Sequence, residues 1–298
     1  MIKFNMQVMR EICNMKEKQF KKYAKYNKDT KSFFKDNDSK ILGIAHLDSV
    51  CKPTHFTPVV LPHRELIFSP TLDDRLGAFL LLDHLPKMGI KFDVLLTTDE
   101  EIGRSTADLF ETSKKYNWMF QFDRAGNDLV MYDYETPELE KMMKKMGWKV
   151  GQGMFSDISE LEHLGCKGFN FGVCYEDYHS YNAYADLTAL KVVVQRFKMF
   201  YDKVAGIHFP HTAITSGYPR SWHRPSNHGY PYDDYEYGRW KYKADEDDDK
   251  HDIWTYTCME CQRYVRVDLN TANRLEVEAA DEDLCIPCYN RFYTNIYD

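Results

Sequence analysis

Long hydrophobic runs are missing from this sequence of 298 residues. No apolar stretch approaches the roughly 18 to 20 residues that a membrane-spanning helix needs. Charged side chains such as Lys3, Arg10 and Lys16 interrupt the first helical pattern, so the N-terminal residues lack the apolar core of a secretory signal. We therefore expect a cytoplasmic protein that does not contact a membrane.

An excess of positive charge is missing as well. Lys and Arg number 39 against 46 Asp and Glu, which gives a net charge of -7 at pH 7. Such a chain has no generally basic surface, so nucleic acid is not an expected partner. Hydrophobic residues make up 43% of the chain and aromatic residues 15%, which is enough for a full core. The length leaves room for one large and one small domain.

The cysteines do not form a pattern that is typical of disulfides. Cys258 with Cys261 and Cys285 with Cys288 form two CxxC pairs about 23 residues apart, which is the spacing of a tetrahedral four-cysteine zinc site of the zinc-ribbon type. Such a site holds one structural zinc ion and does no chemistry. The other four of the eight cysteines are isolated and are expected to be small buried hydrophobic residues: Cys13, Cys51, Cys166 and Cys174.

Composition divides the chain into three parts. Residues 206–250 are rich in Pro, Gly and Tyr and end in an acidic run, which predicts a linker. The large domain is therefore expected over residues 1–205 and the zinc ribbon over residues 251–298, with strands near 264–269 and 275–278. Acidic residues such as Glu276 and Asp281 disfavour a phosphate backbone as the ligand of the ribbon. A structural role or the docking of a protein partner is expected.

Short apolar runs alternate with helical patterns through the large domain. This alternation predicts a mixed, mostly parallel α/β sheet with helices on both faces, in which ligands gather at the carboxyl ends of the strands. Strands are predicted at residues 41–50, 65–68, 92–96, 118–122, 129–132 and 168–174. Helices are predicted at residues 1–22, 78–85, 106–115, 137–146 and 186–204, and a hairpin turn at residues 27–29.

Polar residues follow the predicted strands, and each has an ordinary explanation when taken alone. A histidine can be a hydrogen-bonded structural residue, and an aspartate before a helix can be its cap. Taken together, they supply two imidazoles and three carboxylates, a set suited to a pair of zinc ions bridged by one carboxylate. Of two adjacent glutamates, one can bind metal while the other moves protons. The five candidate ligands are His46, Asp73, Glu101, Asp123 and His179, and the adjacent glutamate is Glu100.

The ordered motifs resemble those of the zinc-dependent exopeptidase superfamily. This superfamily includes bacterial leucyl aminopeptidases, tetrahedral aminopeptidases and glutamate carboxypeptidase-like deacylases. The resemblance covers roughly residues 1 to 204. The matching pieces are His46-Leu47-Asp48, Leu72-Asp73-Asp74-Arg75-Leu76-Gly77, Asp99-Glu100-Glu101-Ile102-Gly103, Phe122-Asp123-Arg124 and Tyr178-His179-Ser180.

The resemblance implies a site with two catalytic zinc ions. Asp73 would bridge the two ions. His46 and Asp123 would complete the coordination of one ion, and Glu101 and His179 that of the other. Cobalt or manganese could occupy the same site, because zinc is inferred only from the types of ligand.

The resemblance also implies the roles of three neighbouring residues. Glu100 would be the general base that takes a proton from the metal-activated water and returns it to the leaving amine. Asp48 would orient His46, which fits their alternation along a strand. The peptide bond between Asp73 and Asp74 would be cis.

The sequence departs from the superfamily pattern in two respects. Relatives carry an acid four residues after the last histidine, where this chain has Ala183, so recognition of the substrate end is in doubt. About 25 residues separate His46 from Asp73 and about 55 separate Asp123 from His179, too few for an inserted lid or dimerisation domain of ~100 residues. We expect the minimal, lidless form of the catalytic domain.

Two residues remain ambiguous at this stage. Ser156 and Asp157 stand where relatives place substrate-contacting residues, but a helix N-cap explains them equally well.

These observations predict a dizinc hydrolase of peptide or other small amide substrates, with an aminopeptidase as the first expectation. A deacylase of N-acyl amino acids is the alternative within enzymes. From a different class, a non-catalytic adaptor that binds a protein partner through its zinc ribbon would also fit. The complete ligand set and Glu100 argue against the adaptor, because a decayed site is expected to lack at least one of them.

Overall fold

The computed structural model describes residues 3–153, 155–212, 253–257 and 264–268. The chain divides into two compact units, Met1–Asn227 and His228–Asp298, and each is described by itself. Within the described residues, no helix combines the length and the apolar character that crossing a membrane requires.

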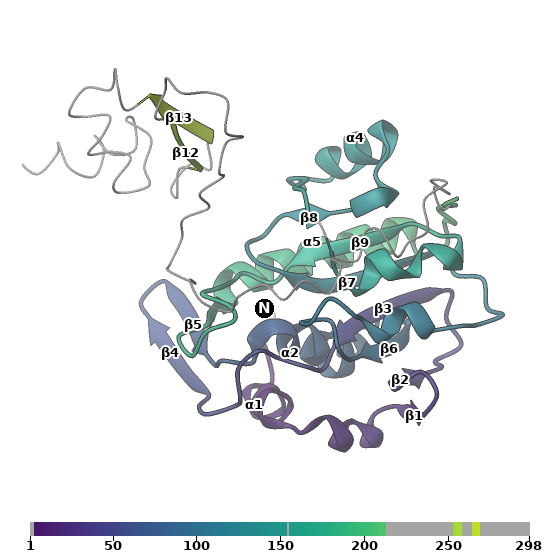
Figure 1. Cartoon of the computed structure of the whole chain (residues 1–298), viewed down its shortest axis with the longest axis horizontal. Helices are drawn as coiled ribbons and strands as arrows, with labels where there is room; N and C mark the ends of the chain where they lie inside the picture. Colours follow the sequence, from purple (N-terminus) through teal and green to yellow (C-terminus); the bar gives the residue numbers. More distant parts are fainter. Residues whose placement is uncertain (1–2, 154, 213–252, 258–263, 269–298) are drawn as a thin grey trace, which may run out of the picture. The chain divides into compact units, whose positions relative to one another are not determined.

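A seven-stranded sheet forms the centre of the first unit (Figure 1). In spatial order its strands are β1 (Lys25–Asn27), β2 (Ser32–Lys35), β6 (Asp93–Thr97), β3 (Ile41–His46), β7 (Trp118–Arg124), β9 (Gly168–Gly172) and β8 (Leu129–Val130). The four strands β6, β3, β7 and β9 are parallel, whereas β1 with β2, β2 with β6 and β8 with β9 pair antiparallel. The α/β class and the mostly parallel sheet core predicted from the sequence are therefore confirmed.

A smaller antiparallel sheet and the helices complete this unit. The small sheet has the order β10 (Tyr175–Glu176), β11 (Tyr184–Asp186), β5 (Arg64–Phe68) and β4 (Thr57–Leu61). The α-helices are α1 (Met6–Asn14), α2 (Leu72–Phe79), α3 (Leu85–Lys87), α4 (Pro137–Lys145) and α5 (Leu187–Val204). Tighter 3-10 turns are η1 (Glu17–Lys22), η3 (Thr106–Leu109), η4 (Tyr132–Tyr134) and η5 (Asp157–Leu164), and η2 (Leu80–His84) is π-helical.

The two faces of strand β7 carry different kinds of side chain. Trp118, Phe120 and Phe122 alternate along the strand, and their ring centroids lie 6.4, 4.8 and 4.9 Å from that of Phe197 on α5. The opposite face carries Gln121, whose side-chain oxygen accepts a hydrogen bond from a backbone amide of η5. The sheet is therefore covered on both faces, which explains why its central strands are apolar almost throughout.

The parallel register brings the carboxyl ends of the central strands to one edge of the sheet. His46, the last residue of β3, is paired with Thr97, the last residue of β6. The acidic residues that follow β6 and those at the end of β7 therefore lie close to His46. This edge is where the sequence predicted a ligand site.

Most of the predicted elements are present, and two predicted helices are altered. The pattern over residues 1–22 is broken between α1 and η1, where the side chain of Gln19 accepts a hydrogen bond from Lys16 N and begins a new turn. The helix predicted over residues 106–115 is wrong beyond the short turn η3. Lys114 and Tyr116 instead turn inward to bind the buried carboxylate of Asp93, so a tertiary contact overrides helix propensity.

The second unit contains an antiparallel pair, β12 (Ile253–Thr257) and β13 (Tyr264–Asp268). The strand predicted near residue 264 is confirmed by β13. The four cysteines of the predicted zinc ribbon, and the strand predicted at residues 275–278, lie outside the described residues.

We expect Phe197→Ala to destabilise the first unit by about 3–5 kcal/mol, because it removes a ring that is wholly buried against β7. Met199 lies on the same helix and is 57% exposed, so Met199→Ala should cost no more than about 0.5 kcal/mol. Urea unfolding monitored by tryptophan fluorescence measures both values. Equal losses in the two variants would contradict this description of the core.

Candidate active site

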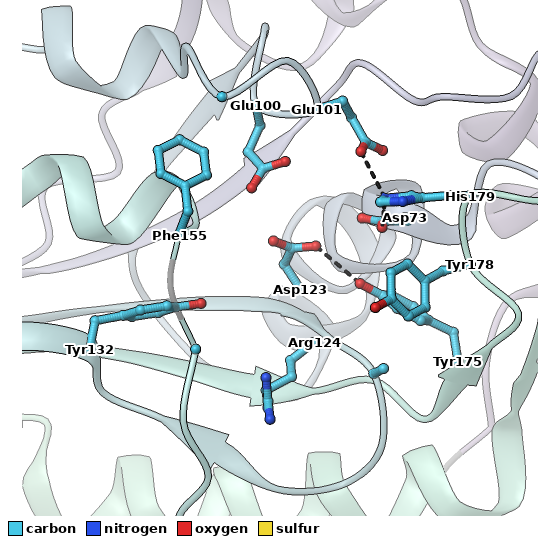
Figure 2. A pocket seen from close by; sticks show the side chains of 13 residues that line it. Asp73, Glu100, Glu101, Asp123, Arg124, Tyr132, Phe155, Tyr175, Tyr178 and His179 are labelled. Atoms are coloured by element: carbon cyan, nitrogen blue, oxygen red, sulfur yellow. Dashed lines mark hydrogen bonds and ion pairs between the residues drawn. The ribbon is translucent and has the colours of Figure 1, made fainter. Parts of the chain in front are cut away.

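A cavity of about 370 Å³ opens at the carboxyl edge of the main sheet, a size typical of small-molecule sites (Figure 2). Its polar side chains come from separate elements that the sheet brings together. They are Asp73 at the start of α2, Glu100 and Glu101 in the loop after β6, Asp123 on β7 and His179 between β10 and β11. His46 lies beneath them and is 1% exposed.

The carboxylate of Asp73 is placed between two imidazoles. Its Oδ1 atom lies 3.2 Å from Nε2 of His46, and its Oδ2 atom lies 3.1 Å from Nε2 of His179. The two oxygens of one carboxylate therefore face two different histidines. This is the arrangement expected of a carboxylate that bridges two cations.

Each histidine has a further carboxylate beside it. Nε2 of His46 lies 3.5 Å from Oδ1 of Asp123, and Nε2 of His179 lies 2.8 Å from Oε2 of Glu101. Glu100 Oε2 lies 3.7 Å from Nε2 of His46. Figure 2 shows the carboxylates of Glu100 and Asp123 facing one another across the cavity. Two groups of possible metal-ligand atoms result, each within 4.8 Å: His46 with Glu100 and Asp123, and His46 with Asp73 and Glu101.

Asp48 contacts both His46 and the backbone of the acidic loop. Nδ1 of His46 lies 3.1 Å from the backbone oxygen of Asp48 and 3.5 Å from its Oδ1 atom. The other carboxylate oxygen of Asp48 accepts a hydrogen bond of 3.0 Å from Glu101 N. Because Nδ1 faces these oxygens, Nε2 of His46 is the nitrogen directed at the cavity carboxylates.

The local charges raise the pKa values of both histidines. Burial alone would lower the pKa of His46, but the carboxylates of Asp123 and Asp73 raise it well above its ordinary value. Burial also opposes the charge on His179, yet its bonds with Asp73 and Glu101 raise its pKa to about 10. In the absence of cations, both side chains are therefore in the positively charged imidazolium form at neutral pH.

The pKa values of the cavity carboxyl groups are shifted in opposite directions. Burial works against the charge of Asp73, but hydrogen bonds from His179 and His46 hold its pKa below the ordinary value. Burial raises the pKa of Glu100 to about 9, and the charge of Asp123 adds to this rise. Burial and the charge of Asp73 raise the pKa of Asp123 to about 7. Crowding therefore keeps some of these acids protonated unless further positive charge enters the site.

One acceptor atom supports a fit to divalent cations. Glu101 Oε1 is buried and has no hydrogen-bond partner among the residues that the structure describes. Carboxylate oxygens without donors are costly to bury unless a cation or water compensates them. The oxygen and imidazole ligands of this cluster suit zinc, cobalt or manganese. The cluster could therefore hold cations of this type.

The backbone around the cavity has unusual conformations. The peptide bond between Asp73 and Asp74 is cis, which confirms the expectation from the resemblance. Asp99, Tyr132 and His179 adopt the left-handed region with φ of 65°, 48° and 61°. Non-glycine residues adopt this region uncommonly, although Asp and His do so more often than most.

Ser156 and Asp157 lie beneath the cavity wall and are 1% and 0% exposed. Ser156 is the N-cap residue of η5, the second explanation that the sequence left open. Its hydroxyl donates to Gln121 Oε1 at 2.8 Å and lies 3.2 Å from Asp123 Oδ2. In the structure Ser156 contacts the candidate ligand Asp123, Asp157 accepts a hydrogen bond from Gln121, and both residues are buried.

Several site residues were not found from the sequence. Tyr175 donates a hydrogen bond from its hydroxyl to Asp123 Oδ1 at 3.2 Å, and Gln121 lies two residues before Asp123 on the same face of β7. The period of two along a strand could have identified Gln121. Tyr175 belongs to a strand of two residues, too short to leave a pattern. The cavity wall also includes Arg124, Tyr132, Phe155 and Tyr178 (Figure 2).

No protein-family profile matches the chain, and no curated protein matches its sequence. Among solved structures, the TET1 peptidase of Pyrococcus horikoshii is 13% identical, with a TM-score of 0.47 over 65% of this chain and 98% of that chain. Aminopeptidase PepT of Bacillus cereus is 11% identical, with a TM-score of 0.49 over 65% and 97%. A TET aminopeptidase of a marine sediment archaeon of the Thaumarchaeota is 12% identical, with a TM-score of 0.49 over 67% and 96%. Structural similarity at this low sequence identity does not show that this chain shares the activity of those proteins.

Cation binding at this site should release protons. An imidazolium ion must lose one proton to bind a metal, and His46 and His179 are both charged at neutral pH in the cation-free protein. Glu100 and, in part, Asp123 also hold protons there. We therefore expect more than two protons to be released per chain at pH 7, and the affinity for cations to increase as the pH rises from 6 towards about 10. Isothermal titration calorimetry in buffers of different ionisation enthalpy measures this release.

A matched pair of variants tests which histidines are involved. His179→Gln should reduce the release by about one proton, whereas His63→Gln, at an exposed position, should leave it unchanged. Binding without proton release would show that the two imidazoles are not ligands.

Proposed function

We propose that this protein is a metal-dependent hydrolase of amide bonds, with an aminopeptidase as the first candidate. The observation that supports this proposal most strongly is the carboxylate of Asp73, whose two oxygens face the two histidines at 3.2 and 3.1 Å. One more acid stands beside each histidine. A pair of like half-sites that share one carboxylate is typical of two-cation hydrolytic centres.

The proposed ligands are divided between two cations. Asp73 bridges them, His46 and Asp123 hold one, and Glu101 and His179 hold the other. Zinc is the first candidate, with cobalt or manganese as alternatives. When bound, such a pair supplies Lewis acidity, which lowers the pKa of a water molecule and polarises a carbonyl oxygen.

Glu100 is the proposed general base. Its carboxylate faces the cavity, and its Oε2 atom lies 3.7 Å from Nε2 of His46, one of the proposed ligands. Burial raises its pKa to about 9, and nearby cations would lower it from there towards neutral pH. A carboxyl group with a pKa near the working pH can take a proton from the attacking water and return it to the leaving amine.

A deacylase of N-acyl amino acids is the second candidate, and a specific observation favours it. Each acid in the cavity wall belongs to the proposed ligand and base set, so no further acid in that wall is left to hold a substrate ammonium. The wall instead carries the guanidinium of Arg124, held by Asp128 at 2.8 and 3.1 Å. Comparison of turnover on aminoacyl anilides and on N-acyl amino acids distinguishes the two candidates.

The adjacent glutamates should have separable effects. Glu100→Gln should leave cation binding nearly intact and lower kcat about 100-fold or more, because it removes the proton acceptor. Glu101→Gln should lower the affinity for one cation, because it removes a proposed ligand. Elemental analysis and turnover on an amide panel measure these effects. An active Glu100→Gln enzyme would exclude Glu100 as the base.

The predicted zinc ribbon can be tested by counting metal. The full chain should hold about three zinc ions, two in the catalytic site and one bound by the four cysteines. Replacement of Cys258 and Cys261 by Ser should reduce the count to about two without loss of turnover. A single zinc, lost in that variant, would instead favour the adaptor that binds a protein partner.

A further inference from the structure

The carboxylate of Asp123 is held from beneath by a buried amide donor and has a buried hydroxyl beside it. Gln121 Nε2 donates to its Oδ2 atom at 3.1 Å, and the hydroxyl of Ser156 lies 3.2 Å from the same atom. The other oxygen, Oδ1, lies on the side of His46 and of the Tyr175 hydroxyl. The two oxygens of Asp123 therefore have different surroundings, one fixed by the protein interior and one directed at the cavity.

The orientation of the Gln121 amide is itself determined by the backbone. Its Oε1 atom accepts a hydrogen bond from Ile158 N at 3.2 Å, and a backbone amide can only donate. The side-chain NH2 group must therefore lie on the other side, toward the carboxylates. There it donates to Asp123 and also to Oδ2 of Asp157 at 2.9 Å. One amide thus separates two buried carboxylates that would otherwise repel each other.

Asp157 connects this network to the loop that carries the adjacent glutamates. Its Oδ1 atom accepts hydrogen bonds from the hydroxyl of Thr97 at 2.8 Å and from the hydroxyl of Ser105. Thr97 ends β6, and Ser105 is the N-cap residue of η3, which directly follows the loop. Asp157 is wholly buried. Its three hydrogen-bond donors, Thr97, Ser105 and Gln121, come from three separate segments. The network fixes the end of β6 relative to β7.

We propose that Gln121 is a positioning residue, which with Ser156 and Asp157 fixes the carboxylate of Asp123 so that Oδ1 is directed at a bound cation. This inference rests on the proposed function, in which Asp123 is a ligand of one of two cations. Gln121 itself contacts neither cation nor substrate. Partners that orient a metal ligand contribute about 10–100-fold to metal affinity in known sites.

The test measures binding of Mn²⁺ by the full chain, followed through the electron paramagnetic resonance of the free ion. Mn²⁺ prefers oxygen and nitrogen ligands to thiolates, so the predicted cysteine site should not contribute. Gln121→Met keeps the length of the side chain and removes the amide. The affinity for one of the two Mn²⁺ ions should fall about 10–100-fold, while the other is nearly unchanged. Ser156→Ala, a smaller change, should lower the same affinity by a lesser factor.

Tyr134→Phe is the matched control. It removes a buried hydrogen bond of 2.6 Å to the backbone oxygen of Ile158 in the same turn η5, but it removes no hydrogen bond of Gln121, Ser156 or Asp157. This variant should bind both Mn²⁺ ions as the unmodified chain does. Equal weakening of both ions in Gln121→Met, or the same loss in Tyr134→Phe, would overturn the positioning role.

A double variant shows whether Gln121 acts through Asp123. Asp123→Asn should weaken the affected ion by itself, and addition of Gln121→Met should weaken it no further, because the ligand to be positioned is already altered. Full additivity would overturn the inference. An unmodified chain that binds no pair of Mn²⁺ ions would contradict the proposed function itself, so the two failures are distinguishable.

Discussion

The site depends on an imbalance of charge at one edge of the main sheet. Asp73, Glu100, Glu101 and Asp123 line one cavity, and the imidazole in its wall is that of His179, 45% of whose side chain is exposed. Carboxyl groups that share one buried cavity cannot all be ionised unless positive charge compensates them. The proposed pair of divalent cations would supply that charge and would give buried Glu101 Oε1 a partner. The same crowding that makes the cation-free site costly would therefore make the cation-bound site stable.

The fold creates this crowding with short connections. The parallel strands β3, β6 and β7 bring together three ends that carry or precede proposed ligands, and only the β4–β5 hairpin lies between β3 and the start of α2. Helix α2 packs closely against β7 near Gly77. A Cβ atom added to Gly77 would lie 2.2 Å from Asp74 Oδ1 and 2.4 Å from the backbone oxygen of Phe122. Helix α2 can therefore approach β7 closely enough for Asp73 to contact residues from both sides of the site.

The sequence predicted much of this arrangement because strand ends and apolar runs leave strong signals. His46 and Asp123 were found as polar residues that end apolar strands, and the structure brings them within 3.5 Å. Other features leave no local signal. Strands β10 and β11, which frame His179, have two and three residues, and the segment that contains Lys114 is shaped by a carboxylate distant in the sequence. Such features depend on tertiary contacts, which periodicity and propensity do not record.

Gln121 is a polar residue inside an otherwise apolar strand. The sequence showed this exception, but the apolar pattern alone does not explain it. Gln121 lies in the middle of β7, between two phenylalanines that pack against α5, and it is wholly buried. A buried amide is less favourable than an apolar side chain unless each of its polar atoms is bonded, and here both are. An apolar residue at this position would fit the strand but could not separate the carboxylates of Asp123 and Asp157. Where a sequence departs from the pattern that its fold prefers, the reason lies in the site that the departure supports.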